Sequence, residues 1–269
     1  MQPVKMLCCL TINHDKLNTM NAYIPEKAKI FSGSALKFIA AVIMMIDHTT
    51  KALIYNCVIK GGNAVKLVPF MSHRQLYNIL RGVGRLAFPI FCFFIVEGFL
   101  YTRNRARYFM RLLLFGVISE IPFDLGLYES RWYPRHQNVM FELALAVLML
   151  WTWEAIGRSR RLHGGLLLIL QALSAAGFLI AAQKLHLDYG FKGLSLILVL
   201  YLLHFERVTQ CTAGALNIAI WEWPAVFAFP LMCLYNGKRG RSIKYFFYTF
   251  YPGHLALLAL LTGILKNRI

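Results

Sequence analysis

The chain has 269 residues, of which 58% are hydrophobic and 14% aromatic, and its mean hydropathy is +0.53. A soluble domain of this length does not carry repeated apolar runs of membrane-spanning length, so the composition excludes an ordinary soluble protein. The net charge of +17 does not indicate a nucleic-acid partner, because the basic residues lie mostly between apolar segments, where they can meet lipid headgroups.

Residues 1–34 are expected to form a polar tail, because their short apolar run VKMLCCLTI is not followed by a small-residue cleavage site. Residues 35–269 are expected to form one all-α, polytopic integral membrane helical bundle, since only helices satisfy the backbone of such segments in lipid. A helical span needs roughly 20 mostly apolar residues. About eight segments meet this requirement: 35–56, 79–101, 109–128, 138–156, 165–183, 190–205, 211–235 and 245–265.

Lysines and arginines between the first spans place the N-terminus inside, according to the positive-inside rule, and a cell (inner, cytoplasmic) membrane is expected. The rule then conflicts with eight simple spans, which would put the basic stretch NGKRGRSIK outside. Either 211–235, interrupted at WEWPA, is a broken or doubled element, or a neighbouring segment does not span.

Seven of the 12 acidic residues fall within the apolar segments. An ionisable side chain inside the bilayer normally faces the bundle interior and has a partner. These acids either join helices through ion pairs or mark a functional site, and the sequence leaves both readings open. They are Asp47, Glu97, Glu120, Asp124, Glu142, Glu154 and Glu222.

The first span places a cation and an imidazole on one helical face. Lys37 and His48 are eleven residues apart, which is almost three turns and roughly 16 Å along the axis. We expect the two side chains to line one cleft. Asp47 points about 100° away from His48, so its expected partners are Lys51 or an arginine from another helix.

Later spans add further candidates. Arg81 and Arg85 share a face near Pro89, which is expected to bend that helix, and they either bind an anion or pair with acids. Glu120 and Asp124 share a face around Pro122, and they are expected either to hold arginines or to form a structural polar cluster. Glu97 is also expected to belong to a structural polar cluster. His254 follows a proline-glycine break and either completes a cleft with His48 or satisfies a backbone carbonyl. No metal site is predicted, because these acids lack a histidine at ligand spacing.

Five blocks of the sequence resemble the TraX family of integral membrane proteins, named for a pilin N-acetylase of conjugation systems. The resemblance runs from about Leu36 to Leu255 and rests on LKFIAAVIMMIDH, GRLAFPIFCFFIVEGFLYTRN, RLLLFGVISEIPFDL, DYGFKG and KYFFYTFYPGHL. Lys37-x10-His48 is also similar to the Arg/Lys-x10-His signature of membrane acyltransferases that use acyl-CoA. This sequence has lysine where arginine is common.

The resemblance implies an acetyltransferase that uses acetyl-CoA as co-substrate and needs no metal. His48 would be the general base, because imidazole titrates near neutrality. His254 and Asp47 would be further candidate catalytic residues. Lys37, Arg81 and Arg85 would bind the donor. The acceptor would be the N-terminal amine of a pilin, or a hydroxyl of another membrane-associated acceptor.

Two other classes of function fit the same residues. A proton-coupled transporter would also place acids, histidines and broken helices in the membrane, although no duplicated halves are evident. A noncatalytic assembly factor would use these polar residues only to hold helices together.

Overall fold

A computed structural model describes residues 25–61, 71–159, 163–241 and 244–266, and these residues form helices without any β-strand. Residues 1–24, most of the predicted tail, lie outside the described part of the chain. The main helices are α2 (Gly33–Thr49), α3 (His73–Gly84), α4 (Ala87–Tyr101), α5 (Arg105–Phe123), α6 (Val139–Gly157), α7 (Gly164–Lys184), α8 (Phe191–Leu202), α9 (Arg207–Ala219), α10 (Ala228–Cys233) and α11 (Lys244–Lys266). The predicted all-α membrane bundle is confirmed.

The count of eight spans is not confirmed. Within the described residues, five helical segments are long and apolar enough to cross a membrane: Gly33–Ile59, His73–Tyr101, Val139–Gly157, Gly164–Lys184 and Phe246–Lys266. Three predicted spans are not among these five. The segments 190–205 and 211–235 contain the short apolar helices Phe191–Leu202 and Trp223–Cys233, and 109–128 falls on α5 and the π-helix that follows it. Apolar composition alone did not reveal that α8 ends at Leu202, whereas WEWPA did indicate the interruption of 211–235.

Local sequence explains where several helices begin. The Ser32 hydroxyl caps α2 by accepting a hydrogen bond from the Ala35 amide at 3.3 Å. Ser72 and Gln75 form a reciprocal capping box at the start of α3. Asn104 and Asn138 cap α5 and α6 in the same way as Ser32. Each cap satisfies amide groups that the first helical turn leaves without a partner.

The chain is broken between two helices near Pro89, whereas the helix that contains Pro252 is continuous. The predicted bend near Pro89 is a break between α3 and α4 at Arg85–Leu86, because a proline ring clashes with the carbonyl four residues earlier. The expected interruption before His254 is wrong, since α11 continues through Pro252 from Lys244 to Lys266. Residues Thr50–Ile59 continue α2 as a π-helix, and Asp124–Tyr128 continue α5 in the same way.

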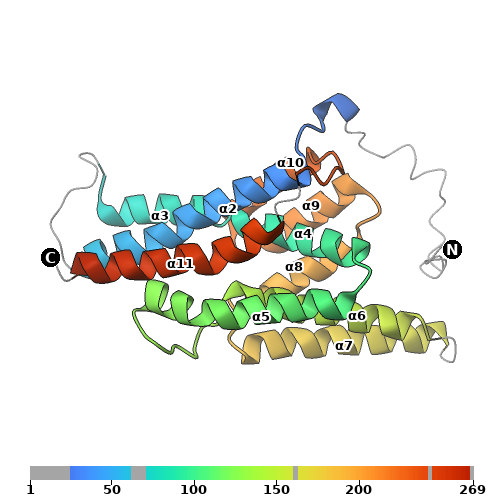
Figure 1. Cartoon of the computed structure of the whole chain (residues 1–269). Helices are drawn as coiled ribbons and strands as arrows, with labels where there is room; N and C mark the ends of the chain where they lie inside the picture. The colour runs from blue at the N-terminus through green and yellow to red at the C-terminus, as the bar shows by residue number, and fades with distance from the viewer. Residues whose placement is uncertain (1–24, 62–70, 160–162, 242–243, 267–269) are drawn as a thin grey trace.

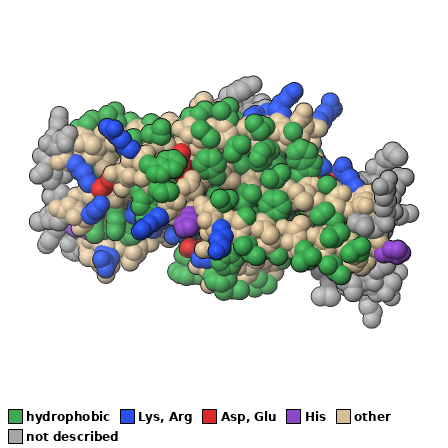
Figure 2. Space-filling model, turned by 90° about the horizontal axis from the view of Figure 1, so that it is seen from below, with side chains coloured by type: hydrophobic (Ala, Val, Ile, Leu, Met, Phe, Trp, Pro, Cys, Tyr) green, Lys and Arg blue, Asp and Glu red, His purple; other side chains and the backbone are tan. Residues whose placement is uncertain are grey.

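Helix α11 lies between the first and middle parts of the chain. It packs against α2 on one side and α5 on the other, and α5 packs against α6, which packs against α7 (Figure 1). Helix α7 is peripheral, and its exposed side chains include Leu168, Leu173 and Ile180. Apolar side chains cover much of the face that lies below in Figure 1 (Figure 2). Such a surface fits contact with lipid.

The stretch between α10 and α11 resolves the conflict over topology. The Gly33 amide donates to the Lys238 carbonyl at 2.8 Å, and the Ser34 amide donates to the Arg239 carbonyl at 3.0 Å. The basic stretch therefore lies at the same end of the bundle as the start of α2. Both alternatives that the sequence left open contribute to this placement. The segment 211–235 is broken into α9, the 3-10 helix Trp223–Phe227 and α10, and the neighbouring segment 190–205 holds only the short helix α8.

Candidate functional site

The structure brings His48 and His254 together in the bundle interior. His48 lies in the last turn of α2 and His254 lies in α11, and their side chains are 9% and 5% exposed. His48 Nδ1 and His254 Nε2 are 2.7 Å apart. The two rings differ in orientation by only 2° and their centroids are 5.0 Å apart, so the bonded nitrogens lie on the line between the rings. The imidazoles are thus joined edge to edge, almost in one plane.

The surroundings of His254 determine which nitrogens carry protons in the neutral pair. His254 Nδ1 lies 2.8 Å from the Phe250 carbonyl oxygen, which can only accept, so Nδ1 carries the proton. His254 Nε2 is then an acceptor, and His48 must donate from its own Nδ1. This leaves a free lone pair on His48 Nε2, the form that a general base requires.

Asp47 takes no part in this pair. It forms an ion pair with Arg81 of α3, the second of the two kinds of partner that the sequence allowed. Arg85 lies 3.4 Å from Glu222, close to the junction of α9 and the following 3-10 helix. Both arginines therefore balance acids from other elements, which is the structural alternative to donor binding.

The remaining predicted polar residues have separate partners. Glu97 lies 3.4 Å from Arg207 of α9. Glu120 accepts a 2.5 Å hydrogen bond from the Asn138 amide group, and Asp124 accepts one of 2.7 Å from the Tyr133 amide. Both carboxyl groups thus hold the connection between α5 and α6. In the described chain, no three His, Cys, Asp or Glu side chains form a group that could hold a metal ion.

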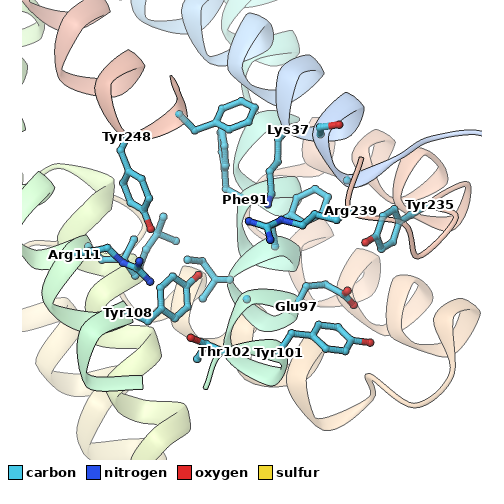
Figure 3. A pocket seen from close by; sticks show the side chains of 18 of the residues that line it. Lys37, Phe91, Glu97, Tyr101, Thr102, Tyr108, Arg111, Tyr235, Arg239 and Tyr248 are labelled. Carbon is cyan, nitrogen blue, oxygen red and sulfur yellow. The ribbon is translucent and has the colours of Figure 1, made fainter. Parts of the chain in front are cut away.

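Lys37 lines a cavity of about 660 Å³ at the end of the bundle where α2 begins (Figure 3). Its wall comes from α2, α4, α5, α6, the stretch after α10 and the start of α11. Ile95, Met140 and Leu143 contribute apolar side chains to it. Neither histidine, Arg81 nor Arg85 is among the lining residues, so the structure places Lys37 and His48 in separate surroundings.

Several cavity residues were missed from the sequence. They are Tyr108 and Arg111 on α5, Arg239 and Arg241 after α10, and Tyr248 on α11. In the sequence, Arg111 is one of the basic residues between apolar segments, and Arg239 and Arg241 belong to the stretch NGKRGRSIK that conflicts with eight simple spans. Their one available signal was the high density of basic residues beside apolar segments, which does not distinguish a cavity from a headgroup contact.

Comparison with known proteins now gives the family. The sequence model described as TraX protein matches residues 32–262. The chain belongs to the TraX family. It is also 33% identical to the probable fimbrial assembly protein FimC, serogroup H1, of Dichelobacter nodosus, over 257 residues that cover 85% of this chain and 94% of the relative. No solved structure matches the chain.

The family match includes most of the site. Residues 32–262 contain both histidines of the pair and the cavity residues from Gly33 to Tyr248. A TraX protein with several apolar helices is a multi-pass membrane protein. The chemistry of this TraX protein must be argued from the site.

Proposed function

We propose that this TraX protein is a membrane acetyltransferase that moves an acetyl group from acetyl-CoA to an amine, or to a hydroxyl. The observation that carries the proposal is the buried pair of imidazoles, which leaves a lone pair on His48 Nε2. A noncatalytic helix contact does not need an imidazole held in one tautomer. A general base in acyl transfer does, because its lone pair must face the acceptor, and here the second imidazole fixes that tautomer.

In the proposed reaction, His48 Nε2 takes a proton from the acceptor while the acceptor's nitrogen or oxygen attacks the thioester carbonyl of acetyl-CoA. The bond between the carbonyl carbon and sulfur then breaks, and the leaving thiolate of CoA receives the proton that His48 took up. An α-amine has a reference pKa of about 8, so most of it is protonated at neutral pH and a base is useful. His254 is a positioning residue here, because it acts only through its hydrogen bond to His48.

Acetyl-CoA is proposed to occupy the cavity that Lys37 lines, with its phosphates at the open end. Lys37 and His48 are separated by roughly 16 Å along α2, a distance that an extended donor arm can cover. The cavity lining does not reach His48. The proposal therefore requires a passage between the cavity and His48 to open when the donor binds.

The acceptor is proposed to be the N-terminal amine of a pilin. Two observations support this acceptor. The TraX family is named for a pilin N-acetylase, and the relative from Dichelobacter nodosus is described as a probable fimbrial assembly protein. The basic end of the bundle is proposed to face the cytoplasm, where positive loops are retained and acetyl-CoA is present. This orientation corresponds to the inner, cytoplasmic membrane.

The test uses purified protein in detergent with labelled acetyl-CoA and a pilin N-terminal peptide. Wild type should transfer the label, and His48→Ala should be slower by about 10²–10⁴-fold, the usual contribution of a general base. His163→Ala is the matched control, because His163 is exposed and its side chain does not cap α7. Equal rates for His48→Ala and wild type would show that His48 is not the base.

A further inference from the structure

The cavity beside the start of α2 has an excess of positive charge. Its lining includes Lys37, Arg111, Arg239 and Arg241, and the only acid among the lining residues is Glu97. Glu97 already pairs with Arg207, which is outside the lining. In the described parts of the chain, none of the four cations forms an ion pair with an acid.

The other partly buried arginines of the described chain do have such partners. Arg81, Arg85, Arg105 and Arg207 each contact a carboxylate within 3.4 Å. Unpaired cations that share one cavity repel each other, and this repulsion costs free energy unless a bound anion offsets it. Arg111 is partly buried and lacks such a carboxylate, which indicates that its anionic partner is a ligand.

The four cations lie at two depths. Lys37 and Arg111 are partly buried, and the Arg111 Nε atom is buried without a hydrogen-bond acceptor. Lys37 Nζ lies 4.5 Å from the centre of the Phe94 ring, a contact that holds its ammonium group toward the cavity without neutralising it. Arg239 and Arg241 are exposed at the mouth.

Figure 3 shows how these side chains face one another. Arg111 lies on one side with Tyr108 and Tyr248, and Lys37 and Arg239 lie across the cavity from it. Guanidinium groups bind phosphate through paired hydrogen bonds, and an ammonium adds a compact charge. Donors on opposite walls suit a ligand with more than one phosphate oxygen exposed in different directions.

We propose that this cavity is a binding site for a phosphorylated ligand, with Arg111, Arg239 and Arg241 as its phosphate-binding residues beside Lys37. Its volume of about 660 Å³ is within the range of small-molecule sites, and its apolar wall suits a less polar part of the ligand. A CoA-linked donor and a phospholipid headgroup share this chemistry. The assignment of the donor rests on the proposed function, whereas the anion site does not.

The test measures binding rather than transfer. Full-length protein in a phosphate-free, uncharged detergent is titrated with coenzyme A, and the dissociation constant is measured by calorimetry at low and high salt. We expect the Arg239→Gln/Arg241→Gln double variant and Arg111→Gln to bind roughly ten- to a hundredfold more weakly, since each loses hydrogen bonds to a charged group. Wild-type binding should weaken as salt rises.

Two control variants separate the site from general positive charge. Lys238→Gln removes a charge from the same exposed stretch, and Arg107→Gln removes one from an exposed position one turn before Arg111. Neither residue lines the cavity, so both variants should bind within about twofold of wild type, as expected for exposed charges. A loss in these controls equal to that of the cavity variants would overturn the proposal.

A second arm distinguishes the two sources of phosphate. Wild type and the double variant are mixed with nanodiscs of phosphatidylglycerol or phosphatidylcholine, and lipid competition with coenzyme A is measured. Binding of both lipids that is weaker in the double variant, without coenzyme A binding, would keep the phosphate site and contradict the acetyl-CoA donor. Failure of coenzyme A and both lipids to bind would overturn the site itself. Since Arg239 and Arg241 are exposed, the thermal midpoint of the double variant should equal that of wild type.

Discussion

At the scale of single residues, the central feature is that one carbonyl determines the protonation of two rings. The Phe250 carbonyl accepts from His254, which in turn accepts from His48. Helix α11 supplies both the carbonyl and His254, so the orientation of His48 depends on a helix more than 200 positions away in sequence. Tyr251 borders both rings, with centroid distances of 6.2 Å to His48 and 5.7 Å to His254.

Replacing His254 tests the positioning role. His254→Phe should lower kcat by between about tenfold and the full base contribution of about 10²–10⁴-fold, because His48 loses the acceptor that fixes its tautomer. The KM for acetyl-CoA should change little, since His254 does not line the cavity. His254→Gln keeps an acceptor oxygen and should recover part of the rate. Equal kcat values for the two variants would argue against the hydrogen bond as the cause.

A pH series adds a second measurement. In wild type the rate should fall at low pH, as the base becomes protonated and cannot accept a proton. In His254→Phe the midpoint of this fall should move, because His48 Nδ1 no longer donates to a neighbouring ring. A structural role alone would lower the amount of folded protein without moving the midpoint.

At the scale of elements, one acid joins three segments at the end of the bundle away from the cavity. Glu129 lies 2.9 Å from Lys60, after the π-helix Thr50–Ile59, and 2.6 Å from Lys266 at the end of α11. Burial alone would raise the pKa of Glu129, but hydrogen bonds from Lys266 and Lys60 outweigh it and lower the pKa below its usual value. Glu129 itself ends the π-helix Asp124–Tyr128.

This cluster predicts a pH-dependent contribution to stability. A carboxyl whose folded pKa is lowered stabilises the fold at neutral pH, and this contribution disappears as pH falls through that lowered pKa. Glu129→Gln should therefore cost about 0.5–1 kcal/mol at pH 7, as expected for partly exposed pairs. Thermal unfolding in detergent should show the difference at pH 7 and little difference near pH 3. A constant difference would contradict the electrostatic origin.

Close contact between α4 and α5 predicts a second effect on stability. A Cβ atom added at Gly98 would lie 2.6 Å from the Tyr108 hydroxyl oxygen, too close for van der Waals contact. Gly98→Ala should destabilise the protein by about 1–3 kcal/mol, the usual cost of overpacking. In the Gly98→Ala/Tyr108→Phe double variant, part of this loss should be recovered in thermal unfolding. Absence of any recovery would show that the hydroxyl is not the obstacle.

At the scale of the whole molecule, the two ends of the bundle carry different chemistry. The end where α2 begins holds the cavity and its unpaired cations, together with the stretch Lys238–Arg241. The opposite end holds the Glu129 cluster, whose cations are paired. The bundle therefore has unpaired cations around a cavity at one end and a cluster of paired charges at the other.

Site-directed labelling tests this arrangement in membranes. Cysteines introduced as Lys238→Cys and Arg103→Cys should react with an impermeant maleimide from the same side. Arg131→Cys, which lies beyond α5 near the Glu129 cluster, should react from the other side. Wild type is the control for its own cysteines. Labelling of Lys238→Cys and Arg131→Cys from one side would contradict the fold.

The sequence predicted the class of the fold well and the spans less well. Apolar runs with internal acids were sufficient for an all-α membrane bundle, and WEWPA correctly marked a broken element. The run 190–205 was misread, because its apolar composition continues past the end of α8 at Leu202. Pro252 was misread for a similar reason, since whether a proline breaks a helix depends on the packing around it.

The sequence alone determined that this chain lies in a membrane as helices, that acids in those helices need partners, and that His48 and His254 were candidates. These conclusions follow from local composition and helical periodicity. Only the tertiary structure decided that the two histidines bond to each other, that Arg81 and Arg85 pair with acids, and that Arg111 and Arg239 share a cavity. Such pairings depend on how distant helices pack, and a one-dimensional pattern gives the face of a helix but not its neighbour.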